Sequence, residues 1–169
     1  GGPLTARLEH EDALALDNTA WSMLPTRSTR RVFLVGPDNL FLRSVLEAQP
    51  QVELHVVNDL PNDVGPEDVL VLYQQPFDAL PSGKVLVIEP VSSIPQWQLG
   101  PELETAFVTE QQDSPLLQHI DIHGLEIRGS HKLDLNMDAQ VLARSAGGDA
   151  LLFAFRDGEH HAVVLNVAL

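Results

Sequence analysis

The stretch RVFLVGPDNLFLRSVLEAQPQVELHVVND, residues 31–59, decides the fold of this chain. Residues 32–35 form a short apolar run that is typical of a buried strand, and the glycine and proline that follow end it. A capping aspartate or asparagine then precedes apolar residues at helical spacing, and Pro50 ends this helix. Residues 52–57 form a second apolar strand. The unit predicts a strand, a helix and a parallel strand, which together open an α/β sheet.

Further apolar runs extend this sheet along the chain. Residues 69–73 and 85–88 each have the length and composition of a buried strand, and the loops before them contain proline, glycine and acidic residues. Four such strands, with a helix after the first, predict an α/β fold with a mainly parallel sheet. The crossovers between the strands are expected to be helical or irregular.

The two ends of the chain read as antiparallel β structure. Alternation of apolar and polar residues predicts a β-hairpin within residues 1–28, before a main domain over residues 29–169. At the other end, QVLARS, ALLFAFRD and HHAVVLNVAL are separated by glycine-containing turns and predict a β-meander. Residues 115–119 suggest a short helix, and IDIHGLEIR suggests a further strand. The chain begins without methionine and stops inside a strand pattern, so we expect it to be a segment of a longer protein.

Composition excludes several classes of function. The chain has 169 residues, 24 acidic against 10 basic residues and a formal net charge of -14, which disfavours binding to nucleic acid or anionic lipid. A group of arginines, Arg27, Arg30 and Arg31, is expected to offset nearby acids at a solvated junction. There is no cysteine, so thiol nucleophiles and thiolate metal sites are excluded from this chain. We expect no cofactor.

The order of these pieces resembles a known family. The stretches DALALDNTAWSMLP, RVFLVGPDNLFLRSVLEAQPQVELHVV, VLVIEP, SPLLQHIDIHGLEI and GGDALLFAFRDGEHHAVVLNVAL are similar to the C-terminal part of bacterial membrane proteins with a von Willebrand factor A domain, the Bat-type aerotolerance group. The resemblance implies a flavodoxin-like, class I glutamine amidotransferase-like fold. It also implies a tethered domain, which we expect on the extracytoplasmic side, with other domains of the same protein or envelope proteins as partners.

A true amidotransferase holds a cysteine on a sharp turn after a sheet strand. Here the strand that could hold such a turn, Val85 to Glu89, continues into Pro90 and then Ser92 and Ser93. Either serine could replace the missing nucleophile, but the G-x-S-x-G context is absent and Pro90 disfavours the turn. The simpler interpretation is that both are ordinary loop serines.

A metal site is one alternative source of chemistry. His119, Asp121 and His123 alternate on an expected strand, which would point all three side chains to one face, with His131 as a further candidate ligand. The same alternation also describes a solvated strand face with no chemical role. Both interpretations remain open from the sequence.

The N-terminal acidic cluster and the pair His160 and His161 are two other candidate binding groups. An acidic cluster near the N-terminus could bind calcium, but it lacks the spacing of a calcium loop and is better explained as a charged hairpin turn. His160 and His161 are neighbours on a strand and should therefore point to opposite faces. The acidic cluster comprises Glu9, Glu11, Asp12, Asp17 and the neighbouring Asn18.

The loop Gly36, Pro37, Asp38 and Asn39 is the remaining candidate ligand site. It follows the first strand of the sheet, and open α/β sheets bind ligands at the carboxyl ends of their strands. The loop has a single glycine and lacks a phosphate-binding lysine, so we expect at most a small molecule there.

The sequence therefore favours a non-catalytic interaction or structural domain rather than an enzyme. Two alternatives stay open: a degenerate amidotransferase or hydrolase that uses serine or a metal, and a flavodoxin-like module that binds a small ligand. Trp21 and Trp97 are expected to be packing anchors, and Trp97, in a proline-flanked loop, is the better candidate for a partner surface.

Overall fold

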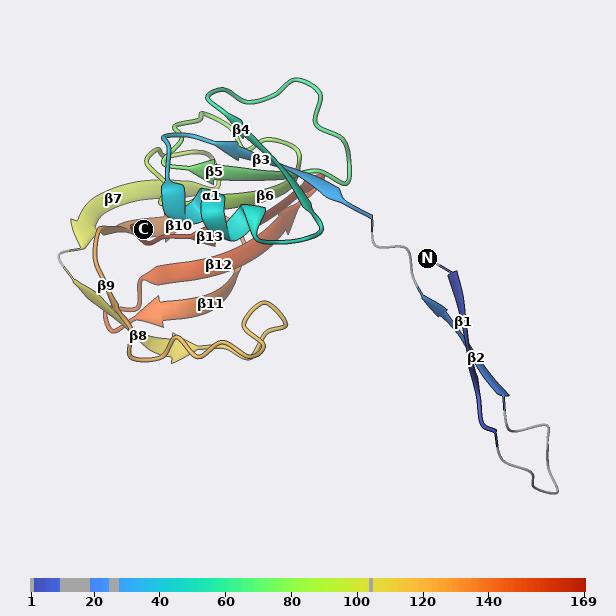
Figure 1. Cartoon of the computed structure of the whole chain (residues 1–169). Helices are drawn as coiled ribbons and strands as arrows, with labels where there is room; N and C mark the ends of the chain where they lie inside the picture. The colour runs from blue at the N-terminus through green and yellow to red at the C-terminus, as the bar shows by residue number, and fades with distance from the viewer. Residues whose placement is uncertain (1, 10–18, 25–27, 104) are drawn as a thin grey trace.

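The computed structural model describes residues 2–9, 19–24, 28–103 and 105–169, and these residues form mostly β structure (Figure 1). They contain thirteen strands and one α-helix. In chain order the elements are β1 (Gly2–Arg7), β2 (Thr19–Leu24), β3 (Arg30–Val35), α1 (Leu40–Glu47), β4 (Val52–Val57), β5 (Val69–Tyr73), β6 (Gly83–Ile88), β7 (Trp97–Leu103), β8 (Ala106–Gln111), β9 (Glu126–Ile127), β10 (Ser130–Leu135), β11 (Gln140–Ser145), β12 (Ala150–Asp157) and β13 (His160–Leu165).

The centre of the molecule is a nine-stranded mixed sheet in the order β4-β3-β5-β6-β13-β12-β11-β8-β9. From β4 to β13 neighbouring strands are parallel, and from β13 to β9 they are antiparallel. The prediction of a mainly parallel, flavodoxin-like α/β fold is therefore wrong. Only the unit β3-α1-β4 has the predicted strand, helix and parallel strand, and the C-terminal meander supplies the antiparallel part of the sheet.

Prolines explain why the crossovers between the parallel strands are irregular, the second of the two expected forms. The chain between β4 and β5 contains Pro61 and Pro66, and the chain between β5 and β6 contains Pro76 and Pro81. Proline removes a backbone donor and clashes with the preceding helical turn, so neither crossover can continue as a helix. Both run as turns and irregular backbone instead.

The region between β8 and β10 also differs from the prediction. Residues 115–119 form turns rather than a short helix, and the expected strand over residues 120–128 is reduced to β9, which has two residues. His119 has a φ of 73°, a conformation that regular strands and helices exclude. This segment therefore lies along the sheet as a turn-rich loop that returns to β8 through β9.

The face of the sheet that bears Phe33, Val85 and Phe153, here called the aromatic face, is fully covered. A separate two-stranded sheet of β7 and β10 packs on it and contributes Trp97, whose exposed fraction is 0%. The indole lies edge-on to three phenylalanine rings at centroid distances of 6.2 to 6.5 Å, and its Nε1 donates to the carbonyl oxygen of Ser92 at 3.1 Å. Trp97 is therefore the packing anchor expected from the sequence and not a surface residue.

The opposite face, here called the α1 face, has a thinner cover. Helix α1 buries Leu42 against the sheet, and it packs in a cluster with Leu34 and Val71. Leu86, further along the same cluster, is only partly buried. A single helix is about 10 Å across and strands are about 4.8 Å apart, so α1 covers only about two of the strands in this sheet.

Strands β1 and β2 form the predicted N-terminal hairpin, paired from Gly2 with Leu24 to Arg7 with Thr19. In Figure 1 it projects from the body of the molecule. Its Trp21 is 73% exposed, so the expectation that this residue is a packing anchor is wrong.

Candidate functional site

The predicted ligand loop at the end of β3 has clear structural roles. A Cβ atom on Gly36 would lie 1.9 Å from the carbonyl oxygen of Tyr73, so only glycine lets β3 and β5 approach here. Asn39 caps α1 by accepting a hydrogen bond from the Leu42 N–H at 3.1 Å, and Asp38 lies 3.7 Å from Arg43. None of these four loop residues lines the groove that lies between β6, β13 and β12 or the groove at Asp121. Ligand binding at this loop stays a prediction.

The two serines after β6 tie loops together. The Ser92 hydroxyl donates to the Phe77 carbonyl oxygen at 3.0 Å and accepts from the Phe77 N–H at 3.2 Å. The Ser93 hydroxyl oxygen accepts from the Leu99 N–H at 2.9 Å. Among the described residues neither hydroxyl is hydrogen-bonded to a histidine or a carboxylate, which is the arrangement that an activated serine needs.

Two strained residues lie at the carboxyl ends of neighbouring parallel strands, a feature that the sequence analysis missed. Gln74 follows β5 with a φ of 46°, and Glu89 follows β6 with a φ of 53°. A positive φ is costly for residues other than glycine and often marks a functional turn. The Glu89 Oε2 atom is also buried without a hydrogen-bond partner in the described part of the chain. The two neighbouring strand ends thus each turn sharply at a residue that carries a polar side chain, an amide at Gln74 and a carboxylate at Glu89.

The predicted metal ligands are not brought together. Asp121 and His123 lie in the irregular segment before β9 and line one groove, and the Asp121 carboxylate accepts from the His123 N–H at 3.0 Å. His119 does not line that groove. In the described ranges no group of three His, Asp or Glu side chains is placed to hold a metal ion. The arrangement on one strand face, which motivated the metal hypothesis, is wrong.

Most of the N-terminal acidic cluster falls on residues 10–18, which lie outside the described part of the chain, as does Arg27. His160 and His161 lie on opposite faces of β13, as expected. His160 Nδ1 is 3.1 Å from the Pro81 carbonyl oxygen, whereas His161 is exposed.

The arginine junction is held by a partly buried ion pair. Arg31 donates two hydrogen bonds to the Asp68 carboxylate, at 2.5 and 3.2 Å, and Asp68 also accepts from the Gly65 N–H at 2.7 Å. The hydrogen bond from Arg31, followed by that from Gly65, lowers the pKa of Asp68 below its ordinary value of 3.8. This pair fixes the β4–β5 crossover against the start of β3, in line with the expected structural role.

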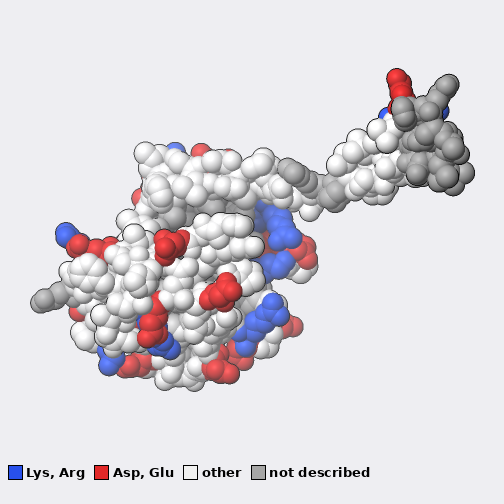
Figure 2. Space-filling view, turned by 90° about the horizontal axis from the view of Figure 1, so that it is seen from below, with Lys and Arg blue, Asp and Glu red and all other residues white. Residues whose placement is uncertain are grey.

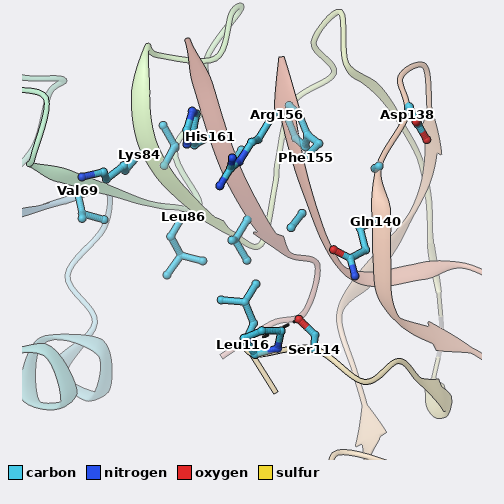
Figure 3. A pocket seen from close by; sticks show the side chains of 16 residues that line it. Val69, Lys84, Leu86, Ser114, Leu116, Asp138, Gln140, Phe155, Arg156 and His161 are labelled. Atoms are coloured by element: carbon cyan, nitrogen blue, oxygen red, sulfur yellow. Dashed lines mark hydrogen bonds between the residues drawn. The ribbon is translucent and has the colours of Figure 1, made fainter. Parts of the chain in front are cut away.

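An open groove lies on the α1 face, with a volume of about 1030 Å³ (Figure 3). Its floor consists of half-buried apolar residues on β6, β13 and β12: Leu86, Val163 and Ala154. The turn-rich segment at residues 114–116 forms one wall, and residues 138–140 form another. We call this feature the open groove.

Basic side chains lie in a row at one end of the open groove. Strand pairing places Arg156 opposite His161 and His161 opposite Lys84, on the face that also bears Leu86. Lys84 Nζ lies 2.7 Å from Glu67 Oε2, and no ion pair with a described residue is found for Arg156. Figure 2 shows one group of Lys and Arg side chains at the end of the body nearest the hairpin and others toward the opposite end, while acidic side chains are spread over the face.

Comparison with known proteins shows a likeness at the level of the fold. A solved glutamine amidotransferase from Thermotoga maritima matches 82% of this chain and 75% of its own, with a TM-score of 0.56 and 12% identity. The exo-β-1,4-mannosidase Op5Man5 from Opitutaceae bacterium strain TAV5 matches with a TM-score of 0.54 and 14% identity, over 82% of this chain but 31% of its own length. No protein family defined from sequence and no curated protein sequence matches.

The amidotransferase resemblance inferred from the sequence is therefore supported for the fold only. No α-helix in the described residues is long and apolar enough to span a membrane.

Proposed function

We propose that this chain is a non-catalytic domain that binds a protein partner. The observation that carries the proposal is the α1 face, where apolar side chains remain exposed both on the helix and in the open groove. On α1, Leu40 is 70%, Phe41 is 65% and Val45 is 45% exposed. Contiguous apolar surface of this kind is characteristic of interaction sites, because leaving it in water is unfavourable.

The strand ends supply the second argument. An amidotransferase needs a thiolate nucleophile, and this chain has no cysteine. The turns after β5 and β6 carry Gln74 and Glu89, and the hydroxyl of Ser92 is occupied by the backbone of Phe77. The amidotransferase-like fold thus serves here as a scaffold that presents surface.

The resemblance to von Willebrand factor A proteins supports a setting for this role. In the proposal the domain is part of a bacterial membrane protein, is tethered on the extracytoplasmic side and contacts the von Willebrand domain of the same protein or other envelope proteins. Its acidic surface, with a formal net charge of -14, favours protein partners over nucleic acid and anionic membranes.

Isothermal titration of the chain with the von Willebrand factor A domain of the same protein tests the binding role. We expect a dissociation constant in the range of about 1 μM or tighter, typical of specific interfaces of standard size. Replacing exposed Phe41 with Asp should weaken binding. An equal affinity of the wild type and Phe41→Asp would remove the α1 face from the proposal.

One observation favours a second candidate, a degenerate hydrolase. Glu89 combines a strained backbone with an unpartnered carboxylate oxygen, which is a pattern found at active sites. Release of ammonia from glutamine and hydrolysis of aryl esters and aryl mannosides should be measured for the wild type and Glu89→Gln. The proposal expects no turnover by either protein, and turnover that is lost in Glu89→Gln would establish the enzyme instead.

A further inference from the structure

We propose that the open groove receives one amphipathic α-helix of the protein partner, parallel to α1, with acidic residues in the last turn of that helix. This inference rests on the proposed role in protein binding and specifies its site. We expect the occupant to be a helix because of the apolar floor of the groove, the position of α1 beside it and the row of basic residues at one end.

The floor of the open groove matches the apolar stripe of a helix. Leu86 on β6 is opposite Val163 on β13, and Val163 is opposite Ala154 on β12. All three are half-buried, in contrast to Val71 on the neighbouring β5, which is 2% exposed. Strands within a parallel sheet are normally covered on both faces, whereas β6 and β13 are only partly covered on the α1 face at Leu86 and Val163.

The spacing between α1 and the floor fits a second helix. Packed helices lie about 8–10 Å apart, and two strand spacings of about 4.8 Å give the same distance. Helix α1 contacts β4 and packs in the cluster over β3 and β5, so the next helix position along the sheet lies over β6 and β13. The crossovers after β4 and β5, which could have supplied this helix from the chain itself, are too rich in proline to do so.

The cations give the incoming helix a direction. Helix α1 runs from the end of β3 to the start of β4, so its C-terminus lies at the amino ends of the parallel strands. Lys84 and His161 lie at the starts of β6 and β13, at the same edge of the sheet. A helix parallel to α1 would bring its C-terminus, which carries partial negative charge, to Lys84 and to Arg156, which lies opposite His161.

Charge also limits what the site can accept. Lys84 already pairs with Glu67, so exposed Arg156 is the cation most available to a partner carboxylate. Asp138 lines the groove at the same edge, to the side of the basic row in Figure 3, and Lys84, His161 and Arg156 at this edge are the basic residues among those that line the groove. The helix is therefore expected to be acidic in its last turn and not throughout.

A displayed library of single amphipathic helices tests this inference. Each member has about 18 residues, a fixed apolar stripe and randomised first and last turns, and the intact chain is used as bait. We expect the selected helices to be enriched in Asp and Glu in the last turn only. In the double variant Lys84→Glu and Arg156→Glu their affinity should fall about tenfold or more.

A matched control keeps the net charge change equal. The double variant Arg128→Glu and Lys132→Glu alters two exposed cations at and beside β10, far from the open groove in the chain topology, and should bind the selected helices like the wild type. Methyl NMR shifts of Leu86 and Val163 on titration should locate the bound helix in the groove, and a loss of affinity in both double variants would contradict the inference.

Several outcomes would overturn the inference without overturning the proposed function. Selected helices that perturb Leu40 and Phe41 but not Leu86 would place the protein site on α1. Binding of the von Willebrand factor A domain at full affinity by the Lys84→Glu and Arg156→Glu variant would do the same. Binding of phosphatidylglycerol vesicles that this variant loses would assign the groove to lipid, and sedimentation as a dimer with a protected groove would assign it to a second copy of the chain.

Discussion

The two faces of the parallel strands are built from the same residue types but are covered in different ways. On the aromatic face, Phe33 and Val85 are buried in one cluster to which β7 and β10 contribute, and Trp97 is fully buried among three phenylalanine rings. On the α1 face, one short helix packs in the cluster with β3 and its neighbours, while Leu86 and Val163 are only partly buried.

The difference separates the residues that hold the fold from those available for binding. The aromatic face contains the larger of the two buried clusters and should account for more of the stability, since stabilisation follows the apolar area removed from water. The α1 face retains apolar surface whose burial is left to a partner. Four predictions test this division, in order of decreasing effect.

Trp97→Ala should cause the largest loss of stability, about 3–5 kcal/mol, because it removes a fully buried ring and the hydrogen bond to Ser92. Urea unfolding followed by circular dichroism measures the loss, and Trp97→Phe should retain part of the stability if the alanine variant does not fold. Trp21→Ala, at a residue that is 73% exposed, is the control and should shift the free energy of unfolding by less than about 0.5 kcal/mol. Equal effects at the two tryptophans would refute the division.

Gly36→Ala should cost about 2–4 kcal/mol, because its Cβ would overlap the Tyr73 carbonyl oxygen and the φ of 131° disfavours a side chain. The change disturbs the turn between the end of β3 and the start of α1. Gly158→Ala is the control: its φ is 58° but a Cβ there has no neighbour within 4 Å, so only about 1 kcal/mol should be lost. Thermal and urea unfolding of both variants would show whether the close approach matters more than the backbone conformation.

Leu42→Ala should cost about 2 kcal/mol, near the lower end for a buried leucine, because the α1 face is only partly closed. Leu40→Ala, on the same helix but 70% exposed, should change the free energy of unfolding by less than about 0.5 kcal/mol. In binding experiments the order should reverse, and Leu40→Ala should lower the affinity for a protein partner more than Leu42→Ala does. A loss at Leu42 as large as that at Trp97 would mean that both faces contribute equally.

Asp68→Asn should have the smallest effect, and one that depends on pH. Since the folded-state pKa of Asp68 lies below its ordinary value of 3.8, its contribution is fully present above about pH 4 and is lost as the pH falls through the lowered value. At pH 7 the variant should therefore unfold at a lower urea concentration than the wild type, and the gap should close in acid. Asp78→Asn, at an exposed residue, should show no such gap at either pH.

The sequence allowed correct local predictions where the chain signals its own breaks. The strand at residues 32–35, the Asn39 cap and the parallel strand at residues 52–57 all follow from apolar spacing and capping chemistry. The hairpin and the C-terminal meander follow from alternation and glycine turns. The class of the whole sheet was not predicted correctly, because the crossovers at residues 58–68 and 74–82 were open to either helix or loop, and their prolines decide for loop.

The candidate site was harder to predict because it depends on what is missing from one face. Leu86 and Val163 have the pattern of buried strand residues, and only the three-dimensional arrangement shows that no helix covers them. The row of Lys84, His161 and Arg156 joins residues from distant parts of the chain through strand pairing. The strain at Glu89 likewise has no signal in sequence, since glutamate rarely adopts a positive φ.

The position of β13 has a consequence for how the molecule folds. This strand pairs in parallel with β6, about 77 positions earlier, and in antiparallel with β12, so it alone joins the two parts of the large sheet. Contacts so far apart in sequence form slowly, because a long loop must close before the pairing is rewarded. During synthesis, β6 and β12 should each keep an unpaired edge until β13 has left the ribosome. We therefore expect these two unpaired edges to be prone to aggregation, or to need chaperone protection, until β13 pairs with them.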